Sequence, residues 1–86
     1  MRLIKLINIQ RKETPIYYRK EYSAEAVLEF LEKNLGIAVE FVVEHKPVGG
    51  VDVRVSLLDE LDYPLLPVVN TIKTHILDLQ DQGKLP

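Results

Sequence analysis

The sequence has 86 residues, of which 47% are hydrophobic and 28% are charged, and its net charge is −2. This composition excludes a disordered or low-complexity chain and predicts one small globular domain over residues 1–86. The absence of cysteine excludes disulfides, thiolate nucleophiles and cysteine zinc sites, and it favours a reducing, cytoplasmic location. The longest uncharged run, residues 63–72, is far shorter than the roughly 20 apolar residues of a membrane span, so we expect no membrane contact.

The N-terminal part of the chain predicts two strands joined by a polar loop. Residues 3–10 offer apolar side chains to both faces of a sheet, with Ile4 and Leu6 on the face opposite the other three. Residues 16–22 predict a second strand because tyrosines favour strands, and the lysine and arginine in it suit a sheet edge.

Residues 24–35 predict a helix. Ser23 is a suitable N-cap, and apolar residues recur at three- and four-residue steps as far as Leu35, with glutamates on the other side. Gly36 is a typical helix stop. We therefore expect a first helix between the second and third strands.

The C-terminal half predicts a β-hairpin followed by a second helix. Residues 37–44 and 51–57 alternate apolar and polar side chains, and turn residues separate the two runs. Beyond them, apolar residues fall within one helical stripe, which begins between Tyr63 and Pro67 and ends at Gly83.

The predicted order of elements is β-β-α-β-β-α. This order indicates an α+β fold, a two-layer sandwich in which two helices cover one face of a four-stranded, mostly antiparallel sheet. The sequence leaves the order of the strands in the sheet open.

Six apolar residues fall outside the predicted core and suggest an interface. They are Phe30, Leu66 and Leu77 on the helices, and Ile4, Leu6 and Val42 on the sheet face that the helices leave uncovered. A contiguous exposed apolar patch usually marks an interaction site. We therefore expect a protein–protein interaction domain that forms a homodimer or binds another protein.

The N-terminal residues support an alternative function. The first 20 residues are strongly basic while the rest of the chain is acidic. The residues concerned are Arg11, Lys12, Tyr17, Tyr18, Arg19 and Lys20. Single-stranded RNA or DNA binders combine cations with aromatic side chains in this way, although solvated charges on an edge strand explain the same residues.

The remaining polar residues predict no enzyme. His45 and His75 lie on different predicted elements, without the partners that a metal site or a general base requires. Asp59, Glu60 and Asp62 precede the second helix, and we interpret them as helix caps rather than as cation ligands. We expect neither a cofactor nor a metal.

Overall fold

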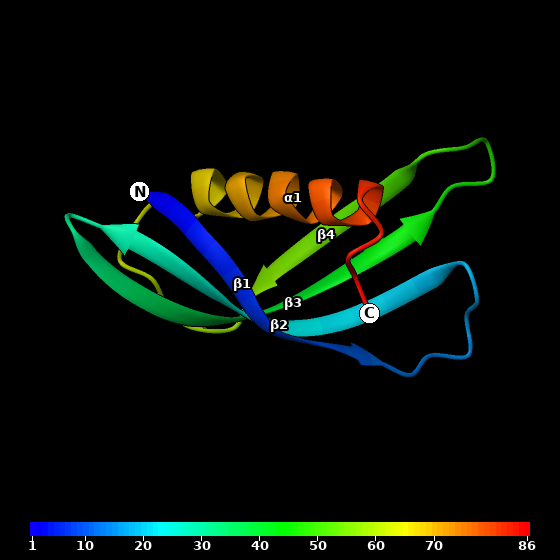
Figure 1. The fold of residues 1–86 in the computed structure, drawn as a ribbon, viewed down its shortest axis with the longest axis horizontal. Coiled ribbons are helices and arrows are strands. Elements are labelled where there is room, and N and C mark those ends of the chain that lie inside the picture. The colour runs from blue at the N-terminus through cyan, green and yellow to red at the C-terminus, as the bar shows by residue number, and fades with distance from the viewer.

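The computed structural model describes residues 1–86 and consists of a four-stranded sheet and one C-terminal helix (Figure 1). The strands are β1 (Arg2–Lys12), β2 (Arg19–Phe30), β3 (Lys33–His45) and β4 (Val51–Leu57), and the helix is α1 (Leu65–Asp81). Each strand pairs antiparallel with the next one in the chain, in the order β1-β2-β3-β4. The sheet is therefore a simple meander.

The α+β class and the four-stranded antiparallel sheet agree with the prediction, but the β-β-α-β-β-α order is wrong. Residues 24–35 form the rest of β2, a tight turn and the start of β3 instead of a helix. Every second residue of β2 from Tyr22 to Leu28 is buried, which is the period of a strand. Because β2 pairs along its length with both β1 and β3, its backbone polar groups are satisfied without a helix.

The other expected elements are confirmed. The predicted hairpin is the β3–β4 pair, and the predicted C-terminal helix is α1, which ends just before Gly83 with its φ of +66°. The expected acidic caps are wrong, because no side chain caps α1 and its first turn contains no acidic residue. Asp59 instead accepts a hydrogen bond from the Ala38 N–H at 2.8 Å. The helix is not of the length and apolarity needed to cross a membrane.

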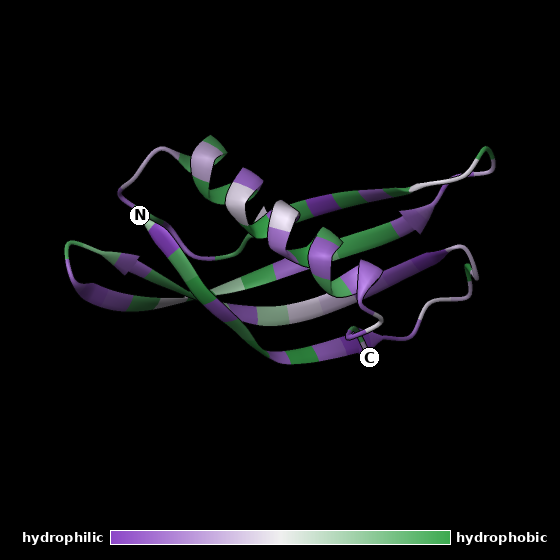
Figure 2. Ribbon diagram, turned by 45° about the horizontal axis from the view of Figure 1, so that its top comes forward, coloured by the Kyte–Doolittle hydropathy of each residue, from purple (hydrophilic) through white to green (hydrophobic).

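The core lies between α1 and the sheet face that it covers. Val68, Ile72 and Ile76 of α1 are fully buried, and the Tyr22 and Phe41 rings stack with centroids 4.8 Å apart. The helix contacts both edge strands, β1 and β4, so the twisted sheet curls around it (Figure 1). Figure 2 shows hydrophobic and hydrophilic residues alternating along the strands, as expected for a sheet with one covered face.

The C-terminal segment is tied to this core by Tyr22. The Tyr22 hydroxyl donates to the carbonyl oxygen of Pro86 at 3.1 Å, and Leu85 packs against the core. Burial raises the pKa of the Tyr22 phenol, and the nearby Arg11 guanidinium acts in the opposite direction.

Strand β1 is irregular, and this changes which side chains face the core. Its register with β2 shifts twice, and Asn8, in the second irregular stretch, has a φ of +54°. Each shift changes the phase of the alternation, so that Leu3, Leu6 and Ile9 all pack against the core. The expectation that Leu6 points to the uncovered face is therefore wrong.

The turn between β2 and β3 has an unusual backbone. Leu31 and Glu32 form a two-residue loop with φ angles of +47° and +67°, and Phe30 pairs with Lys33 across it. Positive φ at both positions defines the type I′ turns that suit the twist of a hairpin, where Asn-Gly is preferred. A leucine and a glutamate there leave the turn strained.

Replacing both turn residues, Leu31→Asn with Glu32→Gly, is expected to raise the free energy of unfolding by about 1–2 kcal/mol, because the new pair adopts positive φ at lower cost. The Leu31 side chain is 97% exposed, so its removal costs little packing. Urea denaturation measures the change as a higher midpoint with an unchanged slope. A double alanine variant keeps the strain and serves as the control; equal stabilisation of both variants would contradict this explanation.

Candidate interaction surfaces

The molecule is elongated, with extents of 41 × 23 × 21 Å, and its two ends differ in chemistry. The β1–β2 and β3–β4 loops lie at one end, while the β2–β3 turn and the N-terminus lie at the other (Figure 1). We call the second the apolar end; its defining residues are Phe30, Leu31, Leu35, Leu61 and Tyr63. We call the β1–β2 loop with its flanking residues 11–20 the basic end.

The apolar end is hollowed. Its five defining residues, together with Met1, line a hollow of about 690 Å³. The Phe30 and Tyr63 rings meet edge to face with centroids 4.9 Å apart, and this contact anchors the segment before α1 to the β2–β3 hairpin. Leu35 remains 44% exposed beside them.

An unpaired strand edge borders this hollow. β3 has 13 residues but β4 has 7, and their pairing stops at Val39 and Leu57. One step further, the Leu58 N–H donates to the Ala38 carbonyl at 2.9 Å. Because the hydrogen-bonding groups of a strand alternate in direction, those of Asn34 and Gly36 point to the same side, where no residue bonds them. We call residues 34–36 the open β3 edge.

The open β3 edge lacks the features that usually block strand addition. The outer edge of β1 carries two register shifts and the exposed cations Arg2 and Lys5, which oppose pairing with another chain. By contrast, residues 34–36 contain neither a charge nor a bulge. This stretch is therefore the part of the sheet best suited to accept another strand.

The six predicted interface residues lie in different surroundings. Leu6 and Leu77 are half-buried against the core, as is Phe30, which also belongs to the apolar end. Leu66 is 70% exposed on α1, and Ile4 is exposed on β1. Only Phe30 of this set borders the hollow.

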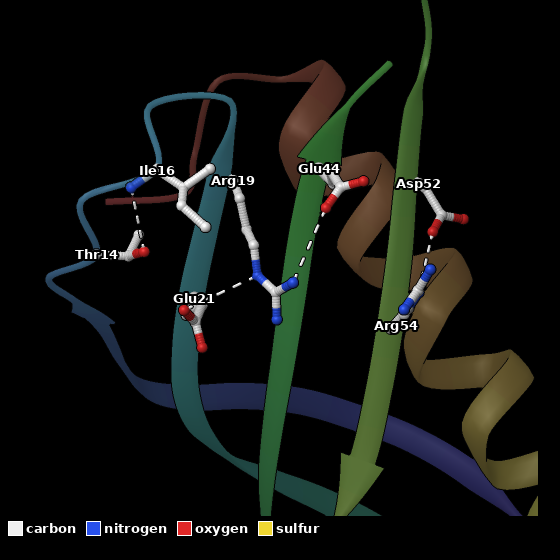
Figure 3. A network of polar contacts seen from close by, with 7 residues as sticks. All are labelled: Thr14, Ile16, Arg19, Glu21, Glu44, Asp52 and Arg54. Atoms are coloured by element: carbon white, nitrogen blue, oxygen red, sulfur yellow. Dashed lines mark hydrogen bonds and ion pairs between the residues drawn. The ribbon is translucent and has the colours of Figure 1, made fainter.

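The sheet face that α1 leaves uncovered carries ion pairs instead of the expected apolar patch. The Arg19 guanidinium lies between Glu21 and Glu44, with N–O distances of 3.8 and 4.0 Å (Figure 3). Arg54 Nε lies 3.3 Å from Asp52 Oδ2. Val42, the sixth predicted residue, is half-buried and lines a small hollow with these side chains. This face is suited to contact with water.

The basic end gathers the residues of the alternative prediction. Arg11, Lys12, Tyr17, Arg19 and Lys20 line one hollow of about 310 Å³, and the acid among its lining residues is Glu13. Tyr18 lies beside Tyr17, with ring centroids 5.7 Å apart in an edge-to-face arrangement. The chain thus brings four cations and an exposed aromatic ring to one loop.

The structure brings no catalytic group together from the remaining candidates. His45 ends β3, whereas His75 lies on α1. No three His, Cys, Asp or Glu side chains are close enough to hold a metal ion.

Sequence reasoning missed Leu35, Leu61, Tyr63 and the open β3 edge. Tyr63 meets Phe30 through the tertiary fold, which no local pattern reveals. The sequence does carry a signal for the edge, since the strand pattern of residues 37–44 extends back through Leu35 once residues 24–35 are interpreted as a hairpin.

These features define a small α+β domain made of a four-stranded antiparallel meander and one C-terminal helix. Residues 1–81 match the model of the BB_0187 family, and the chain belongs to this family. The match includes all four strands and α1. Neither a curated protein nor a solved structure matches the chain.

Proposed function

We propose that this domain is a non-catalytic assembly module in which two copies pair through their open β3 edges. The observation that carries the proposal is the unpaired backbone of Asn34 and Gly36 beside exposed apolar side chains. Strand addition at such an edge gains affinity from main-chain hydrogen bonds and specificity from neighbouring pockets.

A second copy is the occupant that fits, because the edge is complementary to itself. With Leu35 on a two-fold axis, Asn34 of one copy lies opposite Gly36 of the other. Both residues direct their N–H and C=O groups outward, so each of these two pairs exchanges two hydrogen bonds in an antiparallel ladder. The resulting contact is isologous, as two-fold dimers require.

The side chains around the edge support this pairing. The two Leu35 side chains meet near the axis and cover apolar surface that is exposed in one copy. The charged side chains that line the hollow are Lys33 and Asp62, whose opposite signs offset each other. In an isologous contact, Lys33 of each copy can face Asp62 of the other.

Leu35→Asp is expected to weaken self-association by roughly 100-fold, because it places two carboxylates opposite each other at the axis. Leu35 is 44% exposed, so the single copy should stay folded. Light scattering after size-exclusion chromatography is expected to give a dimer mass for the unmodified chain and a monomer mass for the variant. Gly36→Pro tests the backbone separately, because it removes one outward N–H and leaves the bonds of β3 to β2 in place.

Leu66→Asp is the matched control. Leu66 is an even more exposed leucine on α1, so its replacement is expected to leave the dimer intact. Circular dichroism verifies that each variant is folded. A monomeric unmodified chain, or a dimer that Leu66→Asp dissociates and Leu35→Asp does not, would overturn the proposed interface.

A further inference from the structure

We propose that the basic end binds a nucleotide unit of a single-stranded nucleic acid. This inference is independent of the proposed pairing through the open β3 edge, which lies at the other end of the molecule (Figure 1). It is based on the charges, the exposed aromatic ring and the size of the hollow between β1 and β2.

Two of the four cations in this hollow are free to bind an anion. Lys12 forms an ion pair with Glu40, and Arg19 lies between Glu21 and Glu44. Arg11 and Lys20 form no ion pair in the structure. The charge available to a ligand is therefore that of Arg11 and Lys20.

The β1–β2 register holds these two cations together. Arg11 pairs directly with Tyr22, so Lys20, two residues along β2, is its diagonal neighbour on the same face of the sheet. Both residues belong to strands. A phosphate group can thus contact both cations without a rearrangement of the loop.

Tyr17 supplies a stacking surface beside these charges. Its side chain is 92% exposed, although a large aromatic ring gains free energy from burial. The edge-to-face contact with Tyr18 leaves the Tyr17 ring face free for another flat group. Stacking of unpaired bases on exposed aromatic rings next to cations is the usual way in which proteins bind single strands.

The dimensions and the surroundings favour a short segment of single strand over a duplex. The hollow, about 310 Å³, is at the small end of the range for ligand sites. The neighbouring uncovered sheet face carries Glu21, Glu44 and Asp52, which repel a long phosphate backbone. A nucleotide unit, with its phosphate on Arg11 and Lys20 and its base on Tyr17, uses the favourable groups and avoids these carboxylates.

The test is fluorescence anisotropy with labelled twelve-residue oligo-dT and oligo-U probes at low and moderate salt. We expect binding that weakens as salt rises, and Tyr17→Ala is expected to weaken it by roughly 5- to 150-fold while Tyr17→Phe retains it. Arg11→Gln with Lys20→Gln is expected to weaken binding and to reduce the steepness of the salt dependence.

The control for charge is Lys5→Gln with Lys73→Gln, which removes two positive charges outside the basic end. This variant is expected to bind the probes as the unmodified chain does. Equal weakening by both double variants would overturn the site, because binding would then follow net charge alone. Failure to bind either probe at low salt would overturn the proposal, and competition by inorganic phosphate as strong as by unlabelled oligonucleotide would overturn the choice of ligand.

Discussion

Replacing Ala26 by lysine is expected to prevent the domain from folding. Ala26 is completely buried at the centre of the sheet, between Leu6 of β1 and Ile37 of β3, on the face that α1 covers. A lysine there overfills the core and buries an unpaired charge, which together cost several kcal/mol. A domain of this size has a total stability of about 4–13 kcal/mol, so the loss removes most or all of it.

The control for this variant is Val27→Lys, one residue further along. Val27 lies on the uncovered, ion-paired face of the sheet and is half-buried, so a lysine there can reach water. Circular dichroism and urea denaturation are expected to show a folded protein for Val27→Lys and an unfolded one for Ala26→Lys. The reverse result would contradict the strand and restore the helix that the sequence indicates for residues 24–35, in which Val27 faces the core and Ala26 does not.

Ile72→Ala is expected to lower the free energy of unfolding by about 2–5 kcal/mol. Ile72 is fully buried in the middle of α1, between the turns that carry Val68 and Ile76. Truncation removes apolar burial and leaves a cavity, because a helix held against both edge strands cannot collapse fully into the gap. Thermal or chemical denaturation measures the loss directly.

Thr74→Ala provides the comparison on the same helix. Thr74 is exposed, and its hydroxyl donates to the Asn70 carbonyl one turn back, a local bond that contributes little to helix stability. This variant is expected to change stability by less than about 0.5 kcal/mol. A small effect of Ile72→Ala, similar to that of Thr74→Ala, would show that α1 does not hold the core together.

The elements that could be predicted are those with one clear period. The β3–β4 hairpin alternates strictly, and α1 has a single apolar stripe, so both are found as expected. Residues 24–35 fit two periods at once, because the apolar residues of a helical stripe also include alternate positions of a strand. The pairing of β2 with strands on both sides decides between them, and this information is not local.

The same distinction explains the site residues. The basic end could be predicted because its cations and tyrosines are neighbours in sequence on either side of one loop. The apolar end could not, because it joins the N-terminus, the β2–β3 turn and the segment before α1. The prediction for Leu6 is wrong because the two register shifts in β1 change the direction of its side chain, and irregular pairing leaves no mark in an alternation pattern.

The two proposed surfaces are compatible with each other. A dimer formed through the apolar end leaves both basic ends uncovered, because they lie at the far end of each copy (Figure 1). Two linked basic ends would bind one longer strand more tightly than a single copy does, through the higher effective concentration of the second site.

Hydrogen exchange at the open β3 edge tests the proposed assembly most directly. The amides of Leu35 and Ile37 bond to β2, whereas those of Asn34 and Gly36 point outward and are free in a single copy. Pairing of two copies predicts that the Asn34 and Gly36 amides exchange slowly at high protein concentration and faster on dilution, and that Leu35→Asp abolishes this protection. Fast exchange at Asn34 and Gly36 at every concentration would contradict the pairing of β3 edges.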